Sequence, residues 1–198
     1  MKKKILHKAT DLFLTFGVKS VTMDDIAKEL AISKKTIYTY FSTKTKLVEE
    51  STFHLYYKID SEILAICSSD HNPVKELYLV KSLILDHLKN EETSPQYQLQ
   101  KYYPKLFDSI KLKQFESINN CIGNNLKKGI KEGFYRKDLD NNLIVRFYFI
   151  GIMGIKNIEI FPMNKYGMPY LMENFLEYHI RAIATEKGIK SLQKLINK

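Results

Sequence analysis

The stretch SKKTIYTYF, residues 33–41, carries two lysines, two threonines and two tyrosines around two apolar residues spaced four apart. Ser33 at its start is a residue type that caps helices. Ile37 and Phe41 form an i, i+4 pair, which lies on one side of a helix. The stretch therefore predicts a short helix that buries Ile37 and Phe41 and exposes a basic, hydroxyl-rich side.

A second short helix is predicted just before this stretch, over MDDIAKEL, residues 23–30. Thr22 is a good N-cap for it, and Asp24 and Asp25 stand in the first turn, where the helix dipole favours acids. The residues AIS at 31–33 break the chain between the two helices. Two short helices joined by a turn of three or four residues predict a helix-turn-helix.

A first helix, from Lys3 to Phe16, is expected to brace the helix-turn-helix, with Gly17 as its stop. A helix of about two turns does not persist alone in water. We therefore expect Ile37 and Phe41 to pack on other apolar side chains of this region. These are Ile26 and Leu30 of the second helix and Leu12 and Phe16 of the first.

The rest of the chain also reads as helix, so the predicted fold class is all-α. The 198 residues include only eight glycines and five prolines, and apolar residues recur at helical spacing rather than alternating. Further helices are expected over residues 44–66, 74–91, 95–103, 105–132, 140–160 and 169–187, with a short one reaching 197.

The positive charge of the chain is concentrated at its front. The formal net charge is +9, and residues 1–48 hold ten lysines and four acidic residues, a net charge of +6. A basic segment on a nearly neutral body is typical of a module that binds a polyanion. No nucleophile–base pair, glycine-rich phosphate loop or paired carboxylate motif is visible, which argues against an enzyme.

Metal, cofactor and membrane sites find no support. Cys67 and Cys121 are 54 positions apart without a CxxC partner, so we expect two reduced thiols. The histidines lack metal-ligand spacing. The longest apolar stretch, residues 147–155, is too short to span a bilayer, and the start of the chain lacks the features of a signal peptide. We expect a cytoplasmic protein with no metal, no cofactor and no membrane contact.

Residues 5–50 resemble the DNA-binding domain of the TetR family of bacterial transcriptional regulators. The match includes A-x-x-L-F at residues 9–13, Phe16-Gly17, Thr22, Ile26-Ala27, Ser33, Ile37-Tyr38-x-Tyr40-Phe41, Lys44 and Leu47. Two positions depart from the family pattern: Ala31 stands where many members have glycine in the turn, and Thr45 where an acid is common. Neither change removes a DNA contact.

The resemblance implies a role for each matched residue. Thr22 would cap the second helix and contact phosphate, and the third helix would enter the major groove of DNA. Lysine and threonine reach base edges or phosphates, and tyrosine hydroxyls bind phosphate oxygens. The expected DNA-binding residues are Thr22, Ser33, Lys34, Lys35, Thr36, Tyr38, Thr39, Tyr40 and Lys44.

By the same resemblance, residues 1–48 would form the DNA-binding domain and residues 49–198 a larger helical domain for effector binding and dimerisation. Apolar stripes on the helices at 140–160 and 169–187 predict a four-helix dimer interface. Those stripes would alternatively serve the core of the monomer. The expected interface residues are Phe147, Ile150, Gly154, Phe175, Tyr178 and Ala182.

A cluster of aromatic residues is the candidate lining of an effector pocket. Tyr97, Tyr102, Tyr103 and Phe107 stand close together in the sequence, and aromatic rings with polar tips suit a mostly apolar pocket. Core aromatics of a helical protein are the alternative. The sequence as a whole predicts a homodimeric repressor that binds a palindromic operator in double-stranded DNA and is released by an unidentified small molecule. The alternative is an effector-free architectural or protein-partnered DNA-binding protein of the same fold.

Overall fold

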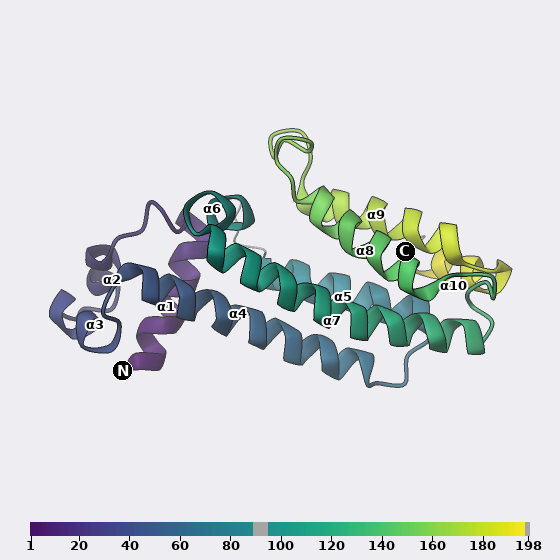
Figure 1. The fold of residues 1–198 in the computed structure, drawn as a ribbon, viewed down its shortest axis with the longest axis horizontal. Coiled ribbons are helices and arrows are strands. Elements are labelled where there is room, and N and C mark those ends of the chain that lie inside the picture. The colour runs from purple at the N-terminus through teal and green to yellow at the C-terminus, as the bar shows by residue number, and fades with distance from the viewer. Residues whose placement is uncertain (89–94, 197–198) are drawn as a thin grey trace. The chain divides into compact units, whose positions relative to one another are not determined.

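The computed structural model describes residues 1–88 and 95–196, which form ten α-helices (Figure 1). The only β pairing within these residues is an isolated antiparallel bridge between Tyr135 and Ala184. The predicted all-α fold is therefore confirmed. The expected helical residues 89–91 and residue 197 lie outside the described residues. The helices are α1 (Lys2–Phe16), α2 (Met23–Glu29), α3 (Lys34–Tyr40), α4 (Lys44–Cys67), α5 (Pro73–Leu88), α6 (Pro95–Tyr102), α7 (Pro104–Lys131), α8 (Asn141–Ile155), α9 (Met168–Ile183) and α10 (Glu186–Ile196).

Two helices end earlier than their apolar periodicity predicts. The helix expected over 140–160 stops at Ile155, so the residues after it lie in a loop. The helix expected over 169–187 stops at Ile183, because Ala184 takes up an extended conformation. The backbone there bonds across to another segment: the Arg136 N–H donates to the Ile183 carbonyl, and Thr185 N–H donates to the Phe134 carbonyl.

The helices form two compact units, each described here by itself. Unit 1 comprises Met1–Ile59 with His87–Lys111, and unit 2 comprises Asp60–Asp86 with Leu112–Lys198. The helices α4 and α7 each contribute residues to both units. The functional boundary at residue 48 stays a prediction.

The core of unit 1 joins α1, α2, α3 and the start of α4. Ile37 and Phe41 are fully buried in it, with Leu12 and Leu30 packed against the cluster, as expected. The expectation for Phe16 is wrong, since this side chain is 54% exposed. The buried side of α1 runs through Ile5, Ala9 and Phe13, four residues apart, and Phe16 lies past its end.

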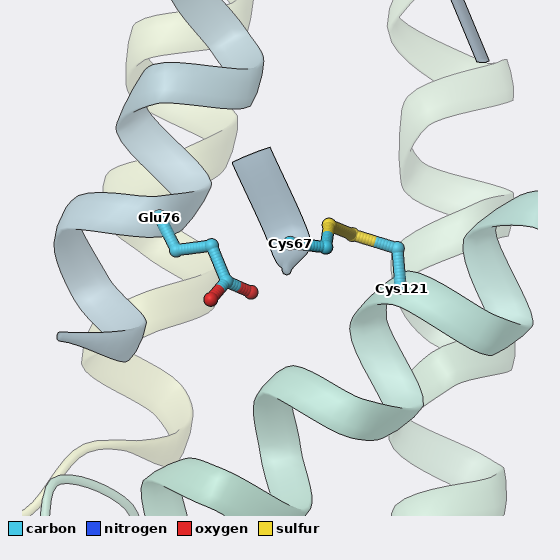
Figure 2. Close-up of side chains that lie close together, drawn as sticks. All are labelled: Cys67, Glu76 and Cys121. Carbon is cyan, nitrogen blue, oxygen red and sulfur yellow. A yellow bond between two sulfur atoms is a disulfide. The ribbon is translucent and has the colours of Figure 1, made fainter. Parts of the chain in front are cut away.

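The two cysteines are joined, which corrects the expectation of two reduced thiols. Cys67 is the last residue of α4 and Cys121 lies in α7, and a disulfide links them with a Cα–Cα distance of 6.2 Å (Figure 2). Sequence spacing carries no information on this pair, because the packing register of two helices brings the residues together. Both residues belong to unit 2.

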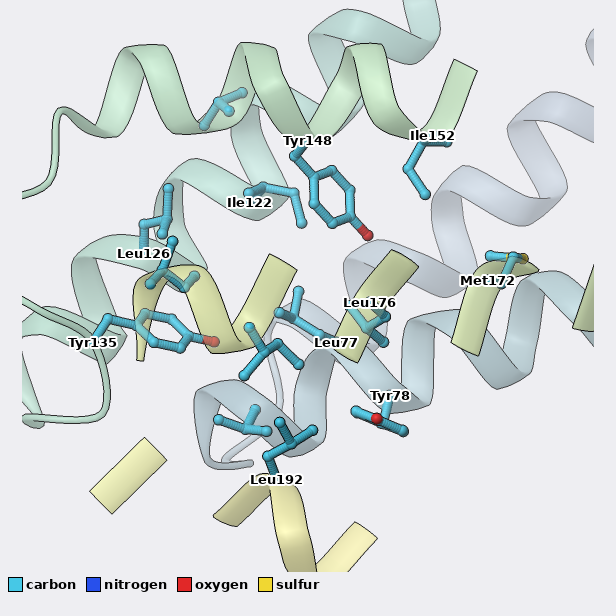
Figure 3. Packing of buried hydrophobic residues seen from close by; sticks show 14 of the residues in the cluster. Leu77, Tyr78, Ile122, Leu126, Tyr135, Tyr148, Ile152, Met172, Leu176 and Leu192 are labelled. Atoms are coloured by element: carbon cyan, nitrogen blue, oxygen red, sulfur yellow. The ribbon is translucent and has the colours of Figure 1, made fainter. Parts of the chain in front are cut away.

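The core of unit 2 draws on α5, α7, α8, α9 and α10 (Figure 3). Helix α8 packs on α9, and α9 packs on α10. Tyr135, between α7 and α8, is 1% exposed and fills the space beside Leu126. Its hydroxyl donates a 3.0 Å hydrogen bond to the side-chain oxygen of Asn125, so the buried phenol is satisfied. None of the described helices combines the length and the apolar character needed to cross a membrane.

Candidate nucleic-acid interface

The start of α2 is fixed by a capping box at Thr22 and Asp25. The Asp25 N–H donates to Thr22 Oγ1 at 3.2 Å, and the Thr22 N–H donates to Asp25 Oδ2 at 2.8 Å. The hydrogen bonds from the Thr22 backbone and side chain lower the pKa of Asp25. The predicted cap is confirmed, with Asp25 as its reciprocal partner.

The turn between α2 and α3 depends on one residue in a left-handed conformation. Ala31 has φ of 51°, a region that side chains other than glycine seldom adopt. The Ala31 N–H donates to the Lys28 carbonyl and the Ile32 N–H donates to the Ala27 carbonyl, which is the Schellman pattern of a helix end. Alanine therefore makes the turn expected of a glycine, with the strain of its Cβ.

The start of α3 is fixed by Ser33, whose hydroxyl accepts a 3.0 Å hydrogen bond from the Thr36 N–H. The Ser33 and Thr36 hydroxyls also lie 2.8 Å apart, within hydrogen-bond distance. Thr39 donates its hydroxyl to the Lys35 carbonyl at 3.0 Å, which leaves its methyl group as the apolar end of the side chain. The predicted N-cap is confirmed.

One side of α3 is exposed and polar, while the other is buried. Ile37 is fully buried, whereas Tyr38 is 43% exposed and Tyr40 41% exposed. Lys34, Lys35 and Thr39 are also exposed. Six of the nine side chains that the sequence proposed for DNA lie in α3, namely Lys34, Lys35, Thr36, Tyr38, Thr39 and Tyr40. Thr22, Ser33 and Lys44 lie at the starts of α2, α3 and α4.

Two of the lysines predicted to bind DNA form hydrogen bonds within the chain that the sequence did not predict. Lys34 Nζ lies 2.7 Å from Asp24 Oδ2, and this hydrogen bond raises the pKa of Lys34. Lys44 Nζ donates to the Lys19 carbonyl at 3.1 Å, and partial burial lowers the pKa of Lys44. Lys44 thereby ties the start of α4 to the segment between α1 and α2.

The four aromatic residues proposed for an effector pocket belong to unit 1. Tyr103 packs against the core of α1–α3, and burial raises the pKa of its hydroxyl. Lys19 Nζ lies 4.9 Å from the ring centre of Tyr102, and Lys101 donates to the Tyr97 hydroxyl. Phe107 is half-buried in α7. Their role as a pocket lining stays a prediction.

Gln98 is a contact in this region that sequence reasoning missed. Its side-chain oxygen accepts a 3.3 Å hydrogen bond from the Lys19 N–H, and its amide lies over Gly17, so that a Cβ there would come within 2.2 Å of it. Helix α6 is therefore held to the segment that joins α1 and α2. No sequence signal marks this contact, because it depends on one polar side chain far away in the chain.

The residues proposed for a dimer interface divide into two groups. Phe147, Ile150 and Tyr178 are 57%, 64% and 74% exposed, and Ala182 is exposed as well. Phe175 is half-buried and packs on Tyr148 of the same chain. A Cβ at Gly151 would lie 2.1 Å from the Phe175 ring, whereas one at Gly154 would meet no atom within 4 Å. Gly151 thus allows Phe175 to pack within the chain. Phe147, Ile150 and Tyr178 are instead exposed on the surface of unit 2.

Sequence comparisons support the nucleic-acid reading of α2 and α3. A model of the family described as "Bacterial regulatory proteins, tetR family" matches residues 5–51. The chain is 49% identical over 49 residues to the HTH-type transcriptional regulator YhgD of Bacillus subtilis, a match covering 25% of this chain and 26% of that protein. The strongest likeness therefore falls on the helices that carry the candidate interface.

Longer matches extend the likeness to most of the chain. It is 25% identical over 149 residues to IcaR of Staphylococcus aureus, a negative transcriptional regulator of the biofilm operon icaADBC, covering 74% of this chain and 80% of that protein. A transcriptional regulator from Saccharomonospora viridis, solved in complex with choline, shares the fold with a TM-score of 0.77 at 18% identity, covering 93% of this chain and 98% of that one. Residues 5–51 therefore carry the helix-turn-helix of the TetR family of bacterial regulatory proteins, and the chain as a whole shares the fold of solved transcriptional regulators.

Proposed function

We propose that the protein is a homodimeric repressor that binds a palindromic operator through α3 and releases it when a small molecule binds. The observation that carries the proposal is the exposed face of α3, where Lys35, Tyr38 and Thr39 stand over a fully buried Ile37 and Phe41. A helix held by one apolar side and free on its polar side fits the major groove of B-DNA. The match of the family model to residues 5–51 supports the same role.

The proposed contacts divide by chemistry. Lys34, Lys35, Thr36, Tyr38 and Thr39 face base edges or the backbone, with the Thr39 methyl suited to a thymine methyl. We assign contacts with phosphates to Thr22, Ser33, Tyr40 and Lys44. Lys34 must exchange its 2.7 Å ion pair with Asp24 for a phosphate or base, which makes Lys35 the more available charge of the two.

Dimerisation would follow from the exposed apolar residues of α8 and α9. Monomeric proteins seldom expose several large apolar side chains on adjacent helices without a partner. Phe147, Ile150 and Tyr178 supply such a surface on α8 and α9, which pack on each other. Two copies joined there as a four-helix interface would present two α3 helices to two half-sites.

Repression and release are proposed from two of the comparisons. The similarity to IcaR, a negative regulator, supports repression. The Saccharomonospora regulator in complex with choline shows that this fold accommodates a small molecule, without identifying one for this chain. A ligand that binds better to a dimer whose α3 helices are wrongly spaced lowers operator affinity by that difference in affinity. We further propose that the protein acts in the cytoplasm and is not an enzyme.

The proposal is tested by selecting bound sequences from a pool of random DNA duplexes with the purified full chain. We expect an inverted repeat to be enriched, and binding to weaken steeply with added salt. Recovery of sequences without a common motif, with weak binding to all of them, contradicts the proposal. Enrichment of a single unrepeated site would favour the protein-partnered alternative.

A further inference from the structure

We propose that Cys67 and Cys121 form a reversible thiol–disulfide switch, oxidised by a hydroperoxide, that changes the affinity of the protein for its operator. The effect on DNA rests on the proposed function, whereas the redox chemistry of the pair stands apart from it. The two residues are the only cysteines of the chain. Their Cα atoms lie 6.2 Å apart, within the range that a disulfide requires.

The pair joins two helices that also contribute residues to the unit that holds α3. Cys67 ends α4, the helix that begins at Lys44 next to the helix-turn-helix, and Cys121 lies in α7. Both helices contribute to unit 1, which holds α3, and to unit 2, which holds the two sulfur atoms. Oxidation therefore restricts the motion of α4 relative to α7, and the unit that carries α3 is continuous with both helices. A covalent restraint shifts DNA binding when the bound and free states differ in that freedom.

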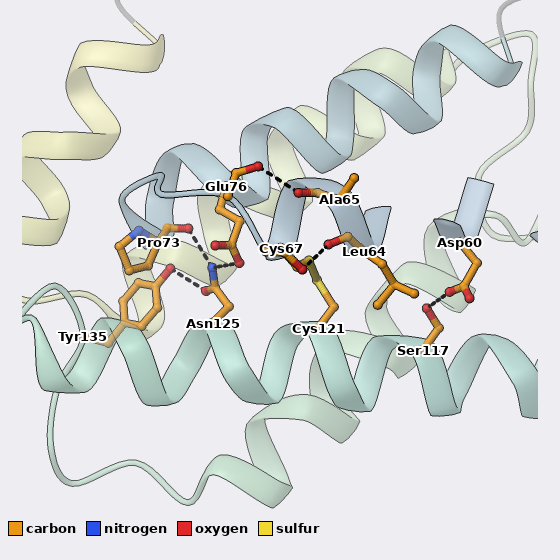
Figure 4. The surroundings of a disulfide bond; sticks show 12 residues. Asp60, Leu64, Ala65, Cys67, Pro73, Glu76, Ser117, Cys121, Asn125 and Tyr135 are labelled. Carbon is orange, nitrogen blue, oxygen red and sulfur yellow. Dashed lines mark hydrogen bonds between the residues drawn. A yellow bond between two sulfur atoms is a disulfide. The ribbon is translucent and has the colours of Figure 1, made fainter. Parts of the chain in front are cut away.

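The packing around the pair does not depend on the bond. Asn125, one turn beyond Cys121, donates to Glu76 Oε1 at 2.8 Å and to the Pro73 carbonyl at 2.9 Å, which ties α7 to α5 (Figure 4). The Ser117 hydroxyl donates to Asp60, which ties α7 to α4 on the other side of the pair. We therefore expect the reduced protein to keep its fold.

The two sulfur atoms differ in access, which assigns them different roles. Cys67 is half-buried, whereas Cys121 is 5% exposed. An oxidant from solvent therefore meets Cys67 first, and Cys121 is the resolving thiol. Glu76 Oε, Cys67 Sγ and Cys121 Sγ all lie within 4.8 Å of one another. Burial raises the pKa of the Glu76 carboxyl, which makes its carboxylate a stronger proton acceptor.

The oxidation balances in two steps. Glu76 accepts the Cys67 thiol proton as the sulfur attacks the hydroperoxide; the O–O bond breaks, Cys67 becomes a sulfenic acid, and the released alkoxide or hydroxide takes up that proton. Cys121 then attacks the Cys67 sulfur, the S–O bond breaks, the disulfide forms and water leaves with the Cys121 proton. Two thiols and one hydroperoxide give one disulfide, one water and one alcohol or a second water. A small dithiol reverses the change by thiol–disulfide exchange.

The proposed cytoplasmic location favours a switch over a permanent crosslink. Reducing compartments keep thiols reduced, and the disulfides that form there are usually transient and serve redox sensing or catalysis. Two cysteines at disulfide distance, in a fold that we expect to persist without the bond, fit the class of transient redox-sensing disulfides. The bond would form when peroxide rises and open again as the dithiol pool recovers.

The first experiment follows the thiols of the full chain by mass spectrometry after alkylation, with a chelator present to exclude metal binding to the thiols. Hydrogen peroxide is expected to convert two free thiols into one disulfide, and dithiothreitol to restore them. In Cys121→Ser, peroxide should leave a sulfenic acid at Cys67 that dimedone traps. In Cys67→Ser, Cys121 should stay unmodified. Glu76→Gln, which keeps an acceptor for Asn125, should slow the oxidation by roughly tenfold or more.

The second experiment measures affinity for the selected duplex before and after oxidation. We expect a change of about fivefold or more, the lower range of allosteric coupling, that dithiothreitol reverses. The double variant Cys67→Ser/Cys121→Ser, checked for native helicity by circular dichroism, should bind DNA with no response to peroxide.

Three results would overturn the switch. One is a folded wild-type protein whose thiols do not pair under peroxide, and another is a disulfide that dithiothreitol fails to open without denaturant. The third is equal affinity of the oxidised and reduced forms for DNA, which would leave the proposed function intact. Failure of both forms to bind any selected duplex would instead reject the proposed function and the regulation together.

Discussion

Ala31 is the residue at which the local sequence and the local backbone disagree. Its φ of 51° lies in the left-handed region, which costs a residue with a Cβ about 1–2 kcal/mol. We predict that Ala31→Gly raises the free energy of unfolding by about 1 kcal/mol, measured by urea denaturation. The matched control is Ala65→Gly at an exposed position within α4, which should lower it by a similar amount. Destabilisation by both glycines would contradict the strain at Ala31.

Lys35 is the residue on which the proposed DNA contact is tested most simply. We predict that Lys35→Ala weakens operator binding by about tenfold and reduces the dependence of binding on salt, because one cation near the DNA is lost. Fluorescence anisotropy at several salt concentrations measures both effects. Lys190→Ala removes the same charge from an exposed site on α10 in unit 2 and should leave both unchanged. Equal losses in the two variants would mean a general charge effect.

At the scale of elements, the exposed apolar residues of α8 and α9 give the clearest prediction. Ile150→Glu should convert the proposed dimer to a monomer in analytical ultracentrifugation, since burying an unpaired carboxylate at an interface is costly. The matched control is Leu112→Glu in α7, because Leu112 is 66% exposed and Ile150 64%. The control should remain dimeric. If Ile150→Glu also stays dimeric, the interface lies elsewhere.

Short helices with capping residues are the elements that could be predicted from sequence. Thr22 and Ser33 each precede a helix, and hydrogen bonds over three residues decide such starts, so the local sequence suffices. The ends of α8 and α9 could not be predicted in this way. Helix α9 stops at Ile183 because the segment around Tyr135 bonds to the backbone after it, and that partner is some fifty residues away.

At the scale of the whole molecule, contacts between residues far apart in the chain could not be predicted from the sequence. Cys67 and Cys121 carry no motif, and their pairing depends on how α4 and α7 pack. The contacts of Gln98 with Lys19 and of Asn125 with Glu76 likewise depend on single polar side chains that no sequence pattern marks. The exposed face of α3 was predictable because the i, i+4 spacing of Ile37 and Phe41 places both side chains on one buried side of the helix.

The buried histidine of unit 2 links the stability of the whole fold to pH. His179 packs against Tyr148 and Phe175, and burial lowers the pKa of its imidazole to about 4 from 6.5. The unfolded chain therefore binds a proton between pH 6.5 and 4 that the folded chain excludes. The stability that depends on a neutral His179 is fully present above pH 6.5 and is lost as the pH falls towards 4. The free energy of unfolding is expected to fall by about 3 kcal/mol over this range.

Urea denaturation from pH 7 to pH 4 measures this loss. The matched variant is His179→Phe, which keeps an aromatic ring and removes the titrating group. Between pH 7 and pH 4 its free energy of unfolding should fall by about 3 kcal/mol less than that of the wild type. An equally steep fall in the wild type and in His179→Phe would show that other groups carry the acid sensitivity.

The central claim is that two copies of α3 read two halves of one operator. Hydroxyl-radical footprinting of the full chain on the duplex selected from random DNA tests it most directly. The account predicts two protected half-sites in inverted orientation, with centres about one turn of B-DNA, or a small multiple of it, apart. Protection of one half-site alone, or even protection along the whole duplex without regard to sequence, would contradict it.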